Sequence, residues 1–327
     1  MNKIIINIDN NKNLTTDLKK QLINFLMTNK SITLNMIDKT RGFYVIFKYK
    51  NQQVEVPFKY LLTNTNKKLN GIPYINFEIT CSSKKKGYCS ICKYCYSILG
   101  QNLFKNNNHK ICLNVLFIRF IINEYNQGNL KPFKLLIDYL KDTPLIRFNC
   151  NNDFNTLNDL KFLIKLSHNL KNTIIYGYTK RLDLKDNIES LDIPKNLIIN
   201  SNYLELSKNG NVYKTTYDLQ EYVLNNYTCK GVCINCLKCT KKANKTIYVL
   251  LHGSKNRIDS IFNTKNNRDY LIKFFNQKYN INLNELDLTV NKGLLSSLNK
   301  YLRSTNHNIQ FKNIKELVDY IKSGGIQ

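Results

Sequence analysis

The sequence predicts an α/β protein whose core is a partial (β/α) barrel-like arrangement around a parallel sheet, with a small α+β region before it and a helical appendage after it. Two observations support this class. Between residues 145 and 200, apolar runs of strand length alternate with segments of helical periodicity, as in βα units. Eight of the ten cysteines form two groups of four, within residues 81–95 and 229–239, which indicates two metal sites that flank this core.

The chain of 327 residues is long enough for one large domain or two ordinary ones, and it can bury a core without metal as its only support. We expect three regions: a small α+β lead-in at 1–79, a cysteine-cluster βα core at 80–256 and a basic helical region at 257–327. No low-complexity linker separates the last two regions.

The N-terminal region alternates between strand and helix patterns. Thr15 or Thr16 can cap a helix whose apolar residues recur at helical spacing. Lys50 and Asn51 form a plausible hairpin turn between two strands. Strands are expected at residues 4–8, 32–37, 42–49 and 53–58.

After the first cysteine group come two helices, the second with Pro132 in its first turn, where the missing N–H costs nothing. These helices are expected at 111–125 and 132–141. The βα alternation then places strands at 145–150, 173–178 and 196–200 and helices at 156–170 and 185–191. Three amphipathic helices at 268–278, 291–304 and 313–323 end the chain, with Gly324 as a stop signal.

Polar residues follow the strands of the predicted core. Asn151, Asn152 and Asp153 come after the first strand of the alternation, and Lys180 and Arg181 come after the second. Because working residues in βα folds lie at the carboxyl ends of strands, these positions are candidate site residues. Lys180 and Arg181 can bind a phosphate or a carboxylate, and a solvated basic pair is the alternative.

Three further residues have two interpretations each. Cys112 and Cys150 occur singly in apolar helix and strand patterns, where a buried thiol is the ordinary explanation. The position of Cys150 near the sheet end leaves contact with a site as an alternative. His252 follows the apolar run at 247–251 and is either a site residue or an ordinary hydrogen-bonded histidine.

The cysteine spacing favours iron–sulfur clusters over a single metal ion. In each group three cysteines follow one another at two-residue gaps, as in the runs that ligate a [4Fe-4S] cluster. Zinc, usually held by two separated Cys-x-x-Cys pairs, is the alternative. Disulfides are disfavoured, because no signal peptide is recognised and cysteines this close rarely pair. The candidate metal ligands are Cys81, Cys89, Cys92 and Cys95 in the first group and Cys229, Cys233, Cys236 and Cys239 in the second.

Charge and hydropathy suggest partners. Lys and Arg total 49 against 23 Asp and Glu, so the formal net charge is +26, and such an excess attracts the phosphates of DNA or RNA. A lysine-rich composition that reflects an AT-rich genome is the alternative explanation. No run of eighteen apolar residues occurs, so we expect no membrane span and an intracellular location, in a host cytoplasm or a virion if the protein is viral. A redox-active cluster would also need an electron donor.

The loop CSICKYCYS resembles the cluster loop of radical S-adenosylmethionine (SAM) enzymes. In that superfamily three cysteines bind three irons and an aromatic residue precedes the last cysteine, as Tyr94 precedes Cys95 here. One gap in this loop is a residue shorter than is usual in the superfamily. A glycine-rich turn after its second strand admits the methionine part of SAM, and Asn151 and Asn152 stand at that position here.

The chain also resembles the phage-associated gene product 88-like family over about residues 79 to 255. The matching features are Cys81 with Cys92-Lys-Tyr-Cys95-Tyr96, a strand followed by Asp153-Phe154, the segment Tyr176-Gly-Tyr-Thr-Lys180, the late cysteine group and His252. The resemblance implies a virus-encoded protein. It also implies cofactor-binding roles for Tyr94, Asn151, Asn152, Asp153, Lys180 and His252.

Cys81 decides what the first cluster can do. If Cys81 is the fourth ligand, the cluster is closed and can only pass electrons or hold structure. If it is not, one iron stays open and reductive cleavage of SAM becomes possible. The second group has four cysteines and is interpreted as a closed auxiliary or electron-relay cluster, or as a loop staple.

Two functions follow from these patterns. The first is an iron–sulfur protein of radical SAM-like type that carries two [4Fe-4S] clusters and acts on, or is bound to, nucleic acid. The second is a non-enzymatic viral protein, stapled by iron–sulfur or zinc, that binds nucleic acid through its basic surface. The sequence leaves open whether the protein is an enzyme.

Overall fold

The computed structural model divides the chain into two compact units, each with its own core. Unit 1 comprises Met1–Cys92, Gly100–Val212 and Lys230–Asn244, and unit 2 comprises Lys93–Leu99, Tyr213–Cys229 and Lys245–Gln327. The residues described are 2–12, 14–29, 42–63, 69–79, 105–150, 152–203, 210–229, 233–243, 245–250, 261–279, 293–304 and 309–324.

The N-terminal part of unit 1 is a three-stranded sheet covered by a helix. Strands β1 (Asn2–Asn7) and β2 (Phe43–Tyr49) pair in parallel, and β3 (Gln52–Pro57) is antiparallel to β2. Helix α1 (Thr16–Thr28) begins after Thr15, whose side chain accepts a hydrogen bond from the backbone N–H of Leu18 at 3.2 Å. These predicted elements are confirmed, whereas the strand expected at 32–37 lies outside the described residues.

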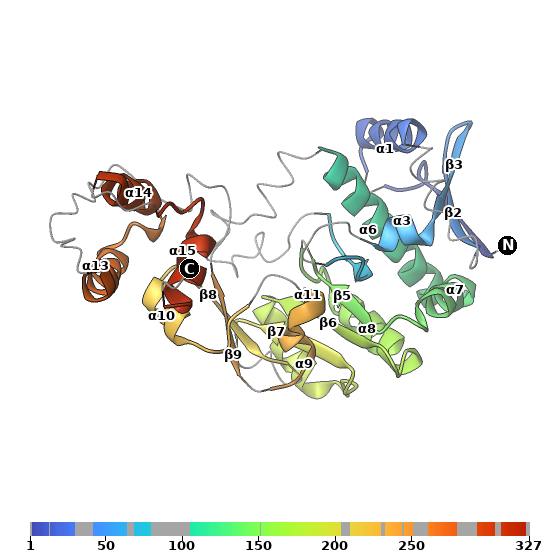
Figure 1. The fold of residues 1–327 in the computed structure, drawn as a ribbon. Helices are drawn as coiled ribbons and strands as arrows, with labels where there is room; N and C mark the ends of the chain where they lie inside the picture. Colours follow the sequence, from blue (N-terminus) through green and yellow to red (C-terminus); the bar gives the residue numbers. More distant parts are fainter. Residues whose placement is uncertain are drawn as a thin grey trace. The chain divides into compact units, whose positions relative to one another are not determined.

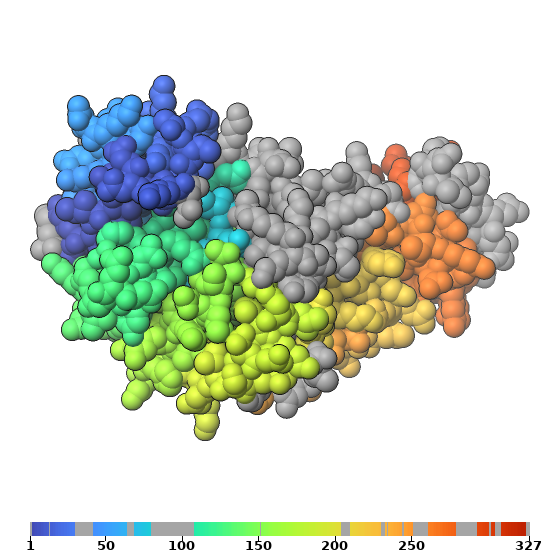
Figure 2. Space-filling view, turned by 180° about the vertical axis from the view of Figure 1, so that it is seen from behind, coloured from blue at the N-terminus to red at the C-terminus, as the bar shows by residue number. Residues whose placement is uncertain are grey.

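Three helices connect this sheet to the larger one. Helix α3 (Phe58–Leu62) follows β3 directly, α6 (Lys105–Asn126) is the longest described helix, and α7 (Lys131–Leu140) has a proline in its first turn. Helix α6 contacts both α1 and α3. The blue N-terminal segments and the green helices therefore form one continuous body in Figure 2. One apolar core runs through all of these elements and into the larger sheet.

The larger sheet has six strands in the order β4-β5-β6-β7-β8-β9, which is also their order along the chain. The pairs from β4 to β8 are parallel. Helices α8 (Leu157–Asn169) and α9 (Lys185–Ser190) connect strands, so the predicted βα alternation with a parallel sheet is confirmed (Figure 1). The strands are β4 (Tyr74–Ile75), β5 (Leu145–Phe148), β6 (Ile174–Thr179), β7 (Leu197–Ser201), β8 (Val212–Thr216) and β9 (Thr246–Leu250).

One face of this sheet, here called the outer face, is apolar. Ile75, Phe148, Ile175 and Ile199 belong to the same buried core as the helices α6, α7, α8 and α9. Gly177 also lies on this face, and a Cβ added there would come within 2.4 Å of the Phe148 carbonyl oxygen. Successive strand residues point to opposite faces, so the residues between these belong to the other face.

The opposite face, here called the inner face, carries large polar and aromatic side chains. The strand register places Tyr74 beside Arg147 and Arg147 beside Tyr176, and one step further along β6 it places Tyr178 beside Asn200. All five side chains are buried or half-buried. In β4 to β7, the outer face therefore packs into the apolar core, whereas the inner face carries hydrogen-bonding side chains.

Unit 2 is mainly helical and has a separate core. It contains α10 (Leu219–Leu224), α13 (Lys265–Tyr279), α14 (Leu294–Ser304) and α15 (Ile314–Lys322). Apolar residues of all four helices form one buried cluster, and the three predicted C-terminal helices are confirmed. Within the described part of the chain, no helix is both long enough and apolar enough to cross a bilayer.

Candidate metal centre on the inner face of the sheet

Several predicted site residues fall on positions that the structure does not describe. The whole first cysteine group lies in this category, so its predicted cluster remains a prediction. The undescribed site residues are Cys81, Cys89, Cys92, Cys95, Tyr94, Asn151 and His252.

The described chain nevertheless shows where the first cysteine loop begins. Strand β4 ends at Ile75, and residues 76–79 continue from the carboxyl end of the parallel sheet toward Cys81. The Asn152 side chain donates a hydrogen bond to the Glu78 carbonyl oxygen. The turn after β5 and the start of the cysteine loop are therefore in contact at the same edge of the sheet.

Asp153 is a buried hub that joins two strand ends. Its carboxylate accepts hydrogen bonds from the Thr179 hydroxyl at 2.7 Å, from the Lys180 backbone N–H at 2.7 Å and from the Phe154 backbone N–H at 2.8 Å. The residue is 4% exposed. Asp153 and Lys180 were both predicted as cofactor-binding residues, and the structure brings them together through the Lys180 backbone.

Arg181 has a structural role in these contacts. Its guanidinium forms two hydrogen bonds with the Asp183 carboxylate, both at 2.7 Å, and donates to the carbonyl oxygens of Phe154 and Asn155. The pKa of Arg181 is raised mainly by the hydrogen bonds to Asp183. Burial lowers the same pKa. Because these groups hold the guanidinium, Arg181 ties the β6 end to the β5–α8 turn.

The second cysteine group divides between the two units. Cys233, Cys236 and Cys239 belong to unit 1 and lie on the short helix α11 (Cys233–Cys236) and the 3-10 turn η4 (Lys238–Thr240). Cys229 belongs to unit 2, where its backbone N–H donates to the Tyr248 carbonyl at 2.8 Å and its carbonyl accepts from the Tyr222 hydroxyl at 3.0 Å. The four cysteines predicted to bind one cluster are thus held by different elements, although they are close in sequence.

Two inner-face side chains donate hydrogen bonds to cysteine sulfurs. The Tyr178 hydroxyl donates to Cys239 Sγ at 2.6 Å, and the Arg147 guanidinium donates to Cys233 Sγ at 3.4 Å. The guanidinium also lies 5.2 Å from the centre of the Tyr178 ring. Donors aimed at sulfur are typical of sulfurs that carry negative charge, as metal-bound thiolates do.

Asparagine side chains fix the cysteine segment to the sheet. Asn200 donates to the Cys239 carbonyl at 3.0 Å and to the Gly177 carbonyl at 3.1 Å. Asn211 donates to the Lys241 carbonyl at 2.7 Å and also to the Asn200 side-chain oxygen at 3.1 Å. The turn that carries Cys239 is therefore held over β6 and β7 by fully buried amides.

The inner face is electrostatically unusual around Tyr176. Burial raises the pKa of this tyrosine most, and the Cys233 sulfur raises it further, while the charge of Arg147 lowers it. A side-chain hydrogen bond between its hydroxyl and Cys233 also raises the pKa. Burial, followed by the charge of Cys150, likewise raises the pKa of Tyr74. Both phenols therefore stay protonated at neutral pH and can act as donors.

The thiols of the second cysteine group remain candidate ligands for a metal group. Hydrogen-bond donors contact the sulfurs of Cys233 and Cys239. A group of three or more Cys, His, Asp or Glu that could hold a single ion is absent from the described residues. A [4Fe-4S] cluster spreads its irons over a larger body than one ion, so its ligands need not converge on a point.

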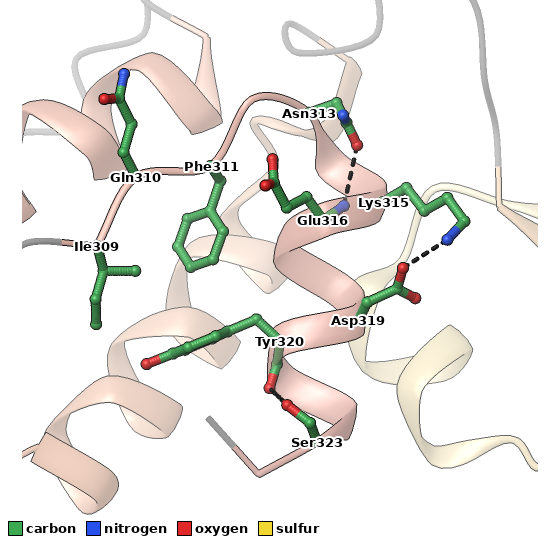
Figure 3. Close-up of a pocket in the computed structure, with 9 residues that line it drawn as sticks. All are labelled: Ile309, Gln310, Phe311, Asn313, Lys315, Glu316, Asp319, Tyr320 and Ser323. Carbon is green, nitrogen blue, oxygen red and sulfur yellow. Dashed lines mark hydrogen bonds and ion pairs between the residues drawn. The ribbon is translucent and has the colours of Figure 1, made fainter. Parts of the chain in front are cut away.

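A cavity of about 590 Å³ lies beside α15 in unit 2 (Figure 3). Several of its polar groups make local contacts: the Asn313 side chain accepts from the Glu316 backbone N–H at 3.0 Å, and Lys315 pairs with Asp319 at 2.5 Å. These contacts are ordinary helix capping and an i,i+4 pair, so we assign no ligand there. The lining residues are Ile309, Gln310, Phe311, Asn313, Lys315, Glu316, Asp319, Tyr320 and Ser323.

Sequence reasoning did not single out Arg147, Tyr176 or Tyr178 as site residues. Arg147 is 86 positions from the cysteine that it contacts, and Tyr178 is 61 positions from its own. A usable signal was the alternation of Tyr176 and Tyr178 in an otherwise apolar strand, because it puts two hydroxyls on one face.

Searches against known protein families, curated proteins and solved structures find no match to this chain.

Proposed function

We propose that the chain is an iron–sulfur protein of radical SAM-like type, with one [4Fe-4S] cluster in the loop of Cys81, Cys89, Cys92 and Cys95. The second cluster belongs to the group that begins at Cys229 and includes Cys233 and Cys239. The observation that carries the proposal is the pair of hydrogen bonds from Arg147 and Tyr178 to the sulfurs of the second group.

The topology supports the first site. The parallel strands follow one another in sequence order, and described helices connect β4 to β5, β5 to β6 and β6 to β7, as is typical of (β/α) units. The first cysteine loop leaves from the carboxyl end of β4, beside the polar turn after β5. Carboxyl ends of parallel strands are where such folds place their chemistry, and Asn152 and Asp153 lie at that edge of the sheet.

Each cluster would supply one-electron chemistry when bound. In the first site, Tyr94 and the turn at Asn151 and Asn152 would border the cofactor, and an iron that Cys81 leaves open would bind SAM. In the second site, Arg147 and Tyr178 would hydrogen-bond the ligand sulfurs, and such bonds shift cluster potentials. Zinc at the same cysteines is the alternative, with a structural role.

The deciding experiment is anaerobic purification followed by metal analysis. A brown protein that absorbs near about 400 nm and holds iron and labile sulfide supports the proposal. A colourless protein with two zinc ions contradicts it and favours the zinc-stapled alternative. For the iron form, reduction with dithionite in the presence of SAM tests the open iron: formation of 5′-deoxyadenosine supports SAM cleavage, and its absence limits the first cluster to electron transfer or structure.

A further inference from the structure

Helix α8 carries a row of basic side chains on the side that faces away from the core. Its apolar residues are buried in the core of unit 1. Lys161, Lys165 and His168 follow one another at spacings of four and three residues, so they share one face of the helix, and all three are exposed. Lys171, also exposed, follows just after the helix ends. These four residues are here called the α8 basic face.

The lysines of the α8 basic face form no ion pair with any residue that the structure describes. The stretch from 160 to 182 contains no Asp or Glu. The acid just before it, Asp159, is fully buried and its carboxylate binds Arg119 on α6. Positive charge on this face is therefore not neutralised by a neighbouring carboxylate of the same helix.

Several exposed lysines elsewhere in the described chain do have acidic partners. The pairs are Lys141 with Asp138 at 3.9 Å, Lys214 with Glu221 at 2.5 Å and Lys315 with Asp319 at 2.5 Å. These lysines are compensated locally, whereas those of α8 concentrate their charge on one surface. They also provide matched positions for a control.

The electrostatics of α8 itself do not explain the row. Lys161 lies in the second turn, away from the C-terminal carbonyls that attract cations. At the other end, the carbonyls of Ser167 and Leu170 accept hydrogen bonds from the Asn196 side chain at 3.2 and 3.0 Å. Lys161 and Lys165 are like charges at i,i+4, which weakly destabilise a helix. An external anion beside this face would relieve their repulsion.

We propose that the α8 basic face binds the phosphate backbone of a nucleic-acid duplex without reading its sequence. A row of ammonium groups on a rigid helix suits the regular row of phosphates on a duplex, and lysine binds phosphate as a point charge. Single strands are bound by stacking their bases on aromatic rings, and the aromatic ring of α8, Phe162, is buried. The surface contains no cysteine, so the inference does not rest on the proposed function.

Two triple variants that lower the net charge equally test the proposal. The first is Lys161→Gln, Lys165→Gln and Lys171→Gln, and the control is Lys141→Gln, Lys214→Gln and Lys315→Gln. Fluorescence anisotropy measures the affinity for a labelled mixed-sequence DNA duplex. Each lost phosphate contact lowers the slope of log affinity against log salt by about 0.9, so between about 50 and 200 mM salt the affinity of the α8 variant is expected to fall about fortyfold less than that of the wild type. The control is expected to keep the wild-type slope.

An unchanged slope in the α8 variant, or the same decrease in both variants, would overturn the inference, because net charge alone would then account for binding. Wild-type protein that binds the single strand more tightly than the duplex, or binds phosphatidylserine vesicles and no duplex, would overturn it as well. Lys161→Arg with Lys165→Arg and Lys171→Arg keeps the charge and is expected to keep the wild-type slope. Circular dichroism melts show whether each variant folds. If the α8 glutamine variant does not, Lys165→Gln alone decides, with an expected decrease in slope of about 0.9.

Discussion

At the scale of single residues, buried side chains with unusual surroundings determine the site and also parts of the stability. On the inner face, the sequence predicts some contacts and not others. The alternation in β6 predicts that Tyr176 and Tyr178 share a face. It does not predict which segment covers that face, because the sulfurs that Arg147 and Tyr178 contact come from 86 and 61 positions away.

Lys110 on α6 is predicted to make stability depend on pH. Burial lowers the pKa of its ammonium group from 10.5 to about 8, although the group lies 4.7 Å from the centre of the Tyr60 ring. Between pH 8 and 10 the unfolded chain therefore binds more protons at this residue than the folded chain. The free energy of unfolding rises with pH across that range, since deprotonation removes the cost of burying the charge.

Lys110→Met is expected to remove this rise and to increase the free energy of unfolding at pH 7 by roughly 1–3 kcal/mol. Urea titrations at pH 7.0, 8.5 and 9.5 measure both effects. Lys134→Met, at an exposed position of α7, is the control and is expected to leave the pH profile unchanged. A Lys110→Met profile that runs parallel to the wild type would contradict the prediction.

At the scale of elements, one carboxylate holds the start of α8 and a side chain of α6. Asp159 is fully buried and accepts backbone N–H bonds from Asn155 at 2.7 Å and Thr156 at 3.0 Å, which completes the capping box of α8. Arg119 on α6 binds the same carboxylate with two nitrogens and also the Phe77 carbonyl.

Asp159→Ala is expected to destabilise the protein by roughly 3–5 kcal/mol, because it leaves a partly buried guanidinium and two backbone donors without their acceptor. The matched control is Asp138→Ala, whose side chain is 58% exposed and lies 3.9 Å from the Lys141 ammonium. That change is expected to cost at most about 1 kcal/mol. Chemical denaturation of both variants gives the comparison, and equal costs would show that the network around Asp159 contributes little.

Long helices were easier to predict from the sequence than short strands. The amphipathic helices α8, α13 and α15 repeat their apolar residues over two turns or more, so their periodicity is readable. Strand β4 has only two residues, which is too short for a local sequence pattern. It is recognised as a strand only because it pairs with β5. Strand β5 ends at Phe148, earlier than the predicted 150, because Asn149 has a positive φ of 51° and turns the chain.

At the scale of the whole molecule, the formal charge of +26 predicts electrostatic binding to nucleic acid. If six or more phosphates are contacted, affinity for a mixed-sequence DNA or RNA is expected to fall about a thousandfold or more between 50 and 200 mM salt. Fluorescence anisotropy with labelled oligonucleotides measures this, with a second oligonucleotide of scrambled sequence expected to bind equally. Binding that is absent at low salt, or insensitive to salt, would refute the prediction.

The predicted regions and the compact units divide the chain in different ways. The predicted regions are continuous stretches of sequence, whereas each compact unit is assembled from separate stretches, and the second cysteine group crosses from one unit to the other. Sequence alone gives no sign of this, because a chain can leave one core and return to it without any change of composition. The α/β class was readable because it depends on local alternation.

The two-sided construction of β6 has a consequence for how the gene can change. On one face of the strand Ile175 packs into the apolar core and Gly177 leaves room for Phe148, whereas on the other face Tyr176 and Tyr178 contact the cysteines. Substitutions that respect this parity can accumulate, but losing or gaining a single codon within the strand would exchange the roles of every later position at once. Among descendants of this gene, the count of residues between Ile174 and Thr179 should therefore drift far more slowly than their identities.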